Sequence, residues 1–151
     1  MSLTALRGRV PVPPPLRTRG HTLTLGFVPG VPGHELMDAG RADAVLRACG
    51  ETLRRIHAVP ADFLRTTPDA DTGTVLVHGD FGPHNLLLNP STHQVTAVVD
   101  WEFAHRGDPV EDLARCAWFQ KFCHRWEPDG PGVRLWEERF RTTAAWQEEP
   151  A

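Results

Sequence analysis

Three short apolar runs beside one polar loop constrain the fold of this chain more than any other feature. The runs span residues 75–77, 86–88 and 95–99. Each has the length and composition of a buried β-strand. Asn89-Pro90-Ser91-Thr92 separates the second run from the third and has the composition of a turn. The sequence therefore predicts an antiparallel hairpin, in which Asn85 opens the first arm and Asp100 closes the second.

The two ends of this hairpin can share a metal ion. Residues that face each other opposite the turn have Cβ atoms roughly 5 Å apart. Magnesium takes oxygen ligands from carboxylates and amide carbonyls, which are the groups that Asp100 and Asn85 carry. The first apolar run leads into the string His78-Gly79-Asp80-Phe81-Gly82-Pro83-His84-Asn85, so an aspartate stands beside the predicted site.

The spacing His-x-Asp-x-x-x-x-Asn resembles the catalytic loop of the kinase fold. Two further strings follow in matching order and spacing, Asp100-Trp101-Glu102 and Gly107-Asp108-Pro109-x-x-Asp112-Leu113-Ala114. Together, residues 75–118 resemble the core of the aminoglycoside phosphotransferase family, which also contains choline kinase and homoserine kinase relatives.

This resemblance implies an α+β, protein-kinase-like fold. The chain would be mainly the helical C-terminal lobe, with a short catalytic β-hairpin and a remnant of the N-terminal lobe. Residues 1–33 would be the remnant of the small lobe and the hinge. Residues 34–151 would be the large lobe, with the catalytic core at 75–118. The chain resembles the large-lobe portion of a longer family member.

The resemblance also implies roles for the residues of the loop and the hairpin. Asp80 would be the catalytic aspartate, and His78 would be the structural histidine of the loop. Asn85 and Asp100 would be the magnesium ligands, and Glu102 falls at the second acidic position of the metal motif. A purely structural role also stays open for two of these residues. Asp80 could be a turn residue that caps its own backbone, and Glu102 could be a solvated carboxylate.

Two further sites follow from the same resemblance. The residues from His21 to Val28 alternate polar and apolar side chains and predict a strand. This strand would run into the hinge, where the backbone of Gly26, Phe27 and Val28 would bind the adenine of ATP or the base of another nucleoside triphosphate. Asp112 would anchor the backbone of the catalytic loop; its ordinary reading is an interaction with the helix dipole.

Helical patterns complete the expected architecture. Residues 41–57 place apolar side chains at helical spacing, and His57 at the end of this helix is expected to be packed rather than to act as a base. Asp108-Pro109-Val110-Glu111 has the composition of a helix start, with an acidic N-cap, proline at N1 and glutamate at N3. Residues 1–16 are rich in proline and are expected to be irregular, and residues 29–33 to form a sharp break.

Charge and composition limit the partners. Residues 1–57 carry eight arginines and four acidic residues, whereas residues 58–151 carry eight basic and fifteen acidic residues. An acidic half suits magnesium and does not suit a nucleic-acid backbone. No apolar run approaches the length of a membrane span, and the three cysteines include no Cys-x-x-Cys pair, so we expect a cytoplasmic protein without nucleic-acid or membrane partners.

Three functions remain open at this point. The first is an ATP- and magnesium-dependent phosphotransferase that transfers the γ-phosphate to a hydroxyl of a small molecule. The second is a truncated or pseudokinase module with weak or no nucleotide binding, because Lys121 is the only lysine and no glycine-rich loop precedes the hinge. In either case, self-association or a completing polypeptide is expected. The third is a metal-dependent hydrolase that uses Asp80, Asp100 and Glu102.

Overall fold

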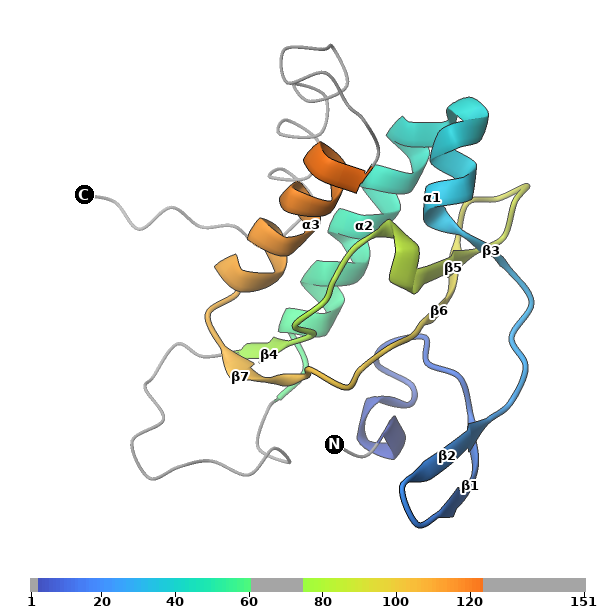
Figure 1. Cartoon of the computed structure of the whole chain (residues 1–151), viewed down its shortest axis with the longest axis vertical. Helices are drawn as coiled ribbons and strands as arrows, with labels where there is room; N and C mark the ends of the chain where they lie inside the picture. Colours follow the sequence, from blue (N-terminus) through green and yellow to red (C-terminus); the bar gives the residue numbers. More distant parts are fainter. Residues whose placement is uncertain (1–2, 61–74, 124–151) are drawn as a thin grey trace.

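The computed structural model of the chain describes residues 3–60 and 75–123 (Figure 1). The part of the predicted large lobe beyond residue 123 lies outside the described residues. The helices α2 (Ala42–His57) and α3 (Val110–Cys123) lie side by side, and the small sheets lie beside and below them. No helix within the described ranges is long and apolar enough to cross a membrane.

The predicted hairpin is present. The strands β5 (Leu86–Leu88) and β6 (Val95–Val98) pair antiparallel, with Leu86 opposite Val98. Their side chains are largely buried because the runs are apolar on both faces. The prediction of a hairpin over these residues is therefore confirmed.

A third strand joins this sheet where a sharp break was predicted. The strand β3 (Val31–Pro32) pairs antiparallel with β5. Gly30 permits this approach, because a Cβ atom there would lie 2.6 Å from Thr96 Oγ1 and 2.9 Å from Leu87 Cβ. The break expected over residues 29–33 is thus wrong for the last part of that segment, since backbone pairing with β5 extends the chain there.

The N-terminal region differs from the expectation in two ways. The strand predicted over residues 21–28 is shorter, because β2 spans Thr22–Leu25. It pairs with β1 (Pro15–Arg19), in a segment whose first residues were expected to be irregular. Gly20 supplies the left-handed turn between the two strands, with φ of 57°. The result is a separate two-stranded sheet with largely exposed side chains.

The residues before this hairpin are also ordered against the core, which corrects the prediction of an irregular segment. Leu3–Leu6 form a short 3₁₀ helix, η1, and the side chains of Leu6 and Val10 are buried in the main hydrophobic core. The backbone N–H of Val98 donates to the carbonyl of Pro11 at 2.8 Å. Burial of leucine and valine side chains overrides the low propensity of the proline-rich sequence.

The helix α2 confirms the pattern predicted over residues 41–57. A short helix α1 (Gly33–Leu36) and a π-type segment η2 (Met37–Arg41) precede it, and Gly40 absorbs the kink with φ of 78°. The helix then buries one apolar face, formed by Val45, Leu46, Cys49, Leu53 and Ile56.

The start of α3 is a capping box, as its sequence predicts. The Asp108 carboxylate Oδ1 accepts the N–H of Val110 at 2.8 Å, and Glu111 Oε1 accepts the N–H of Asp108 at 3.0 Å. These two bonds satisfy amides that have no partner within the helix. They fix where α3 begins, and therefore where Asp112 lies.

Two contacts join α2 and α3. His57 Nε2 lies 3.1 Å from Asp112 Oδ2, and Cys116 hydrogen-bonds with Cys49. That hydrogen bond, together with burial, raises the pKa of the Cys49 thiol well above its usual value. Both cysteines are free and buried, so they act as small core residues.

A further strand, β7 (His105–Gly107), was also not predicted. β4 (Val75–Val77) is present as expected, and it pairs antiparallel with β7. β7 has three residues and no hydrophobic periodicity, so nothing in its sequence marked it as a strand. The β4–β7 pair carries the chain into the polar loop on one side and into α3 on the other.

Candidate active site

The loop between β4 and β5 brings Asp80 and Asn85 together. Pro83–Asn85 form a 3₁₀ turn, η3, which brings Asn85 back toward Asp80. The amide Nδ2 of Asn85 donates to the backbone carbonyl of Asp80 at 2.9 Å and to its carboxylate Oδ2 at 3.1 Å. Both contacts use the amide nitrogen, which leaves the amide oxygen as the atom that can approach a cation.

His78 is buried at the base of this loop. Its Nε2–H donates to the carbonyl of Val99 at 3.0 Å, and its Nδ1 accepts the N–H of Asp80 at 3.3 Å. This pattern requires a neutral ring, and burial lowers the pKa of His78 accordingly. The ring also packs against Trp101, with centroids 4.5 Å apart. His78 thus links the loop to the end of β6 and does not contact the solvent.

Asp112, on α3, is hydrogen-bonded to the backbone of the loop. Its carboxylate is fully buried and accepts the N–H of His78 at 2.9 Å and the N–H of Gly79 at 2.9 Å. The third partner is His57 Nε2, at 3.1 Å. A buried carboxylate with three partners fixes the backbone immediately before Asp80. His57 is therefore a packed residue that contacts Asp112.

Gly79 allows the loop to pass close to the segment after β6. Its φ is 86°, and a Cβ atom there would lie 2.6 Å from the carbonyl oxygen of Phe103. Glycine adopts this left-handed conformation without steric cost and leaves room for Phe103. The position of Asp80 therefore depends on a glycine immediately before it.

Asp100 lies next to the loop, at the end of the hairpin opposite the turn. The N–H of Val99 donates to the carbonyl of Asn85 at 2.9 Å, so the residue after Val99 stands beside the start of β5. The negative charge of Asp100 acts to raise the pKa of both His78 and His84, although burial outweighs it at each. Asp100 has φ of 63°, a left-handed conformation that is uncommon outside glycine.

The donor set here fits magnesium. The Asn85 amide oxygen and the exposed carboxylates of Asp100 and Glu102 are all hard oxygen ligands. Within residues 3–60 and 75–123, no three His, Cys, Asp or Glu side chains form a metal-binding group. A magnesium ion at Asn85 and Asp100 would therefore complete its shell with water and phosphate oxygens, which is the usual habit of that ion.

Two basic side chains also lie near Asp80. His84 Nε2 is 3.4 Å from Asp80 Oδ2, and Arg115 Nε is 3.5 Å from Asp80 Oδ1. Burial lowers the pKa of His84, and the charge of His34, on α1, lowers it further. The sequence analysis did not single out Arg115 or His34, because helical periodicity does not reveal which loop a polar side chain meets.

A cavity of about 280 Å³ opens beside Asp100. Leu23 and Leu25 line it from β2, and Asp100 and Glu102 line it from the segment after β6. The residues predicted to bind adenine, 26–28, do not line this cavity. The N–H of Gly26 donates to the carbonyl of Pro14 at 2.8 Å, and the side chain of Phe27 is 91% exposed.

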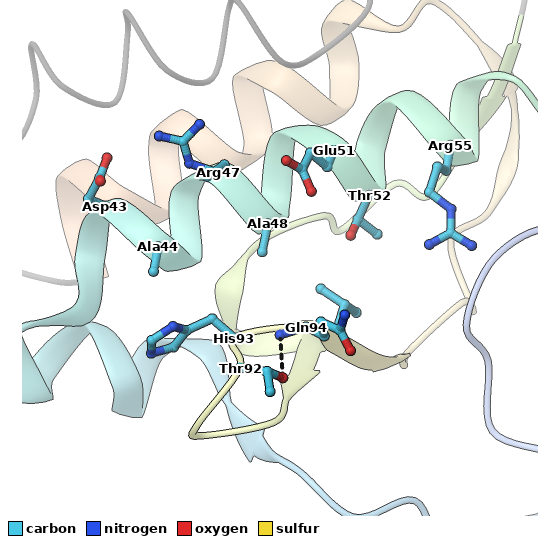
Figure 2. Close-up of a pocket in the computed structure, with 11 residues that line it drawn as sticks. Asp43, Ala44, Arg47, Ala48, Glu51, Thr52, Arg55, Thr92, His93 and Gln94 are labelled. Atoms are coloured by element: carbon cyan, nitrogen blue, oxygen red, sulfur yellow. Dashed lines mark hydrogen bonds between the residues drawn. The ribbon is translucent and has the colours of Figure 1, made fainter.

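A second, more polar groove of about 680 Å³ lies between α2 and the β5–β6 turn (Figure 2). Arg47, Glu51 and Arg55 line it from the helix, and His93 and Gln94 line it from the turn. None of the predicted site residues lies in this groove. Two of the predicted site residues, Asp100 and Glu102, line the smaller cavity instead.

This combination of loop, hairpin and supporting helix defines a kinase-like phosphotransferase fold. The chain matches the family model described as "Phosphotransferase enzyme family" over residues 2–73 and 61–148. The chain therefore belongs to that family, and the predicted resemblance is confirmed.

Solved structures of phosphotransferases share the fold. An aminoglycoside phosphotransferase of Streptomyces rimosus superimposes with a TM-score of 0.72 at 22% identity, covering 97% of this chain and 76% of that chain. A macrolide 2'-phosphotransferase of Brachybacterium faecium gives a TM-score of 0.62 at 20% identity, covering 96% and 63% of the two chains. The predicted protein-kinase-like α+β fold is thus confirmed.

Curated relatives match a shorter stretch at higher identity. Acyl-CoA dehydrogenase family member 11 of Rattus norvegicus is 43% identical over 57 residues, which is 38% of this chain and 7% of that protein. Acyl-CoA dehydrogenase family member 10 of Mus musculus is 51% identical over 41 residues, or 27% and 4% of the two chains. This chain therefore corresponds to a small part of these relatives.

Proposed function

We propose that this chain carries the catalytic site of an ATP- and magnesium-dependent phosphotransferase that transfers the γ-phosphate to a hydroxyl of a small molecule. Another nucleoside triphosphate can take the place of ATP. Membership of the phosphotransferase family supports the reaction class. Structural neighbours were crystallised with ADP and streptomycin, and with GDP and kanamycin, which supports a nucleotide and a small acceptor.

The observation that carries the proposal is the contact between Asn85 Nδ2 and Asp80 Oδ2, at 3.1 Å. It orients one carboxylate oxygen of Asp80, while Asp112 fixes the backbone on the other side of that residue. Asp80 then receives the proton of the acceptor hydroxyl and aligns its oxygen with the phosphate. Positioning and general-base catalysis of this kind contribute on the order of 10²–10⁴ in rate. His78 takes no part in proton transfer in this proposal, because its ring nitrogens are occupied within the loop.

The metal would be held by Asn85 and Asp100, with Glu102 as the next carboxylate. A magnesium ion held there would neutralise the charge of the phosphate oxygens. The pairing of β5 with β6 keeps Asp100, with its left-handed backbone, beside Asn85. In this proposal the ligands would lie together before the nucleotide arrives, which is how such sites gain much of their effect.

The nucleotide base would lie toward Leu23 and Leu25, in the cavity whose other wall carries Asp100. The hinge contacts predicted at the backbone of residues 26–28 do not line this cavity, and the Gly26 N–H is already used, so these contacts rest on the family resemblance alone. In this arrangement residues 1–33 form the small-lobe remnant and hinge, and residues 34–151 form the large lobe. The catalytic core spans residues 75–118.

The isolated chain should bind the nucleotide weakly. Its only lysine is Lys121, so no lysine before the catalytic loop can neutralise the phosphates. Losing a charge-assisted phosphate contact costs a few kcal/mol, and about 1.4 kcal/mol corresponds to a tenfold change in affinity. We therefore expect dissociation constants nearer millimolar than micromolar. The same feature favours the second candidate, a non-catalytic module that keeps the fold.

Two further features support a cellular compartment and a mode of association. The free thiols of Cys49 and Cys116 suit a reducing cytoplasm. The two-stranded sheet β1–β2 has unpaired outer edges within the described residues, and such edges pair readily with another strand. Self-association or a completing polypeptide is therefore expected at this hairpin.

Calorimetric titration with ATP, with and without magnesium, tests the metal site, and Asp100→Ala is the informative variant. It should abolish magnesium-dependent binding while the circular dichroism spectrum stays unchanged; unchanged metal dependence would remove Asp100 from the site. Asp80→Asn should keep nucleotide binding and lose phosphotransfer. Glu51→Ala, on the exposed face of α2, is the matched control. A wild-type chain that binds magnesium-ATP but transfers no phosphate to any acceptor would favour the non-catalytic module.

A further inference from the structure

Arg115 extends from α3 toward the catalytic aspartate. Its Nε lies 3.5 Å from Asp80 Oδ1, and the side chains of the two residues are 48% and 26% exposed. The other carboxylate oxygen of Asp80 contacts Asn85 and His84. The two carboxylate oxygens of Asp80 therefore have different neighbours: Oδ2 faces Asn85, a proposed metal ligand, and Oδ1 faces Arg115.

Most of the Arg115 guanidinium remains available. A guanidinium carries five N–H donors in a planar fork, and only Nε faces Asp80 here. Within the part of the chain that the structure describes, no hydrogen bond uses its terminal nitrogens Nη1 and Nη2. Since the side chain is about half exposed and its Nε lies beside Asp80 Oδ1, its remaining donors can reach a molecule that approaches Asp80.

We propose that Arg115 determines acceptor specificity by binding an oxyanion that the acceptor carries close to its reactive hydroxyl. The acceptor class is then a hydroxy acid or a related anionic alcohol. This inference rests on the proposed phosphotransfer function, since it needs Asp80 to meet the acceptor hydroxyl. Arg115 would hold the oxyanion with two parallel N–H bonds while the hydroxyl lies against Asp80.

The charge of Arg115 also disfavours the opposite class. An acceptor with several ammonium groups would have to place one of them beside the guanidinium or displace Arg115 from Asp80. Like charges at such distances repel, and a site discriminates by the repulsion it builds as well as by attraction. The neighbours crystallised with streptomycin and with kanamycin share the fold at 21% and 16% identity, a likeness that shows the fold and not the acceptor.

The test measures binding of paired probes to the whole chain without nucleotide. Glycolate, lactate and 3-hydroxybutyrate are each compared with their methyl esters, and glycerol 3-phosphate with glycerol, by following the Arg side-chain Nε–Hε resonances. We expect at least one anionic probe to bind about tenfold more tightly than its neutral partner. The carboxylate and phosphate pairs distinguish the two kinds of oxyanion. Streptomycin serves as the polycationic probe.

Three variants separate a specific role from a structural one. Arg115→Gln should remove the preference for the anion while leaving the affinity for the neutral partner unchanged. Arg115→Lys should retain part of the preference, since it keeps the charge but not the fork. Arg54→Gln, another exposed arginine, on α2, should change nothing. Thermal melts of all variants confirm that each is folded.

The proposal is overturned if no anionic probe binds better than its neutral partner, if Arg115→Gln keeps the preference, or if streptomycin binds more tightly than every anion. Because nucleotide is absent, the result is independent of phosphotransfer. Anion preference together with a failed magnesium-ATP titration would refute the proposed function and leave the Arg115 site standing. Phosphotransfer with no anion preference would support the proposed function and refute the Arg115 site.

Discussion

Removal of the Asp112 carboxylate should destabilise the chain more than the change of any exposed carboxylate. The side chain is fully buried and has three partners: the backbone N–H groups of His78 and Gly79, and the ring of His57. Asp112→Ala leaves both backbone donors buried without an acceptor. Hydrogen bonds to a charged group contribute about 1.5–3 kcal/mol each, so the two together predict a loss of about 3–6 kcal/mol.

Such a loss is a large part of the stability of an ordinary domain, which is about 5–15 kcal/mol. Asp112→Asn is the gentler change, because it keeps the shape and one acceptor oxygen. Its amide NH₂ must then face a donor, and we expect it to cost about half as much as the alanine variant. The graded pair keeps the prediction testable even if the alanine variant does not fold.

Urea unfolding followed by circular dichroism measures both losses, with Glu51→Ala as the exposed control that should stay within about 0.5 kcal/mol of the wild type. The m-value should not change if the variants unfold from the same native state. A cost below about 1 kcal/mol for Asp112→Ala would show that the loop does not depend on this carboxylate, and the argument for how Asp80 is positioned would fail.

Three further predictions concern neighbouring residues. Gly79→Ala should cost several kcal/mol, because its Cβ would lie 2.6 Å from the carbonyl oxygen of Phe103 at φ of 86°; a variant as stable as the wild type would contradict this geometry. Asp108→Ala should cost about 0.5–2 kcal/mol by removing the cap of α3, measured by thermal melts, and no change would show that the cap is dispensable. The hydrogen bond to the Phe103 carbonyl, with the Glu111 carboxylate, raises the pKa of His105. Its protonated form should therefore stabilise the fold fully below the unfolded value of about 6.5. That contribution should be lost as the pH rises through the raised folded value, so His105→Asn should cost more at pH 5.5 than at pH 8. The difference should stay below about 1 kcal/mol because the pair is half exposed, and an equal cost at both pH values would contradict the assignment.

The β5–β6 hairpin and both long helices could be predicted because their signals are local. Continuous apolar runs bounded by a turn mark the strands, and the capping box at Asp108 marks the start of α3 within a few residues. The same local signals place Asn85 beside Asp100, because the side of a hairpin opposite its turn is fixed by the strand register. Nothing about distant parts of the chain was needed.

The elements that were missed depend on distant partners. β7 is a strand because β4 lies beside it, and β3 because Gly30 lets the chain approach β5. β1 and β2 expose most of their side chains; the polar and apolar alternation over residues 21–28 therefore predicted β2 as too long, and β1 was not predicted. The order of the first residues comes from burial of Leu6 in a core that is formed mostly by later residues.

The position of Arg115 follows from Asp112 once the helix is known. Residues three and four apart lie on the same face of a helix. Asp112 is hydrogen-bonded to the loop, and Cys116 contacts Cys49 on α2. Because Arg115 lies between them in the sequence of α3, it is held beside the loop rather than on the opposite face of the helix. The buried carboxylate of Asp112 thus fixes the backbone next to Asp80 and also the side of the loop from which the Arg115 guanidinium reaches Asp80. A residue that supports the loop and a residue that faces the acceptor can be supplied by a single helical turn, so a substitution at Asp112 should alter acceptor preference as well as stability.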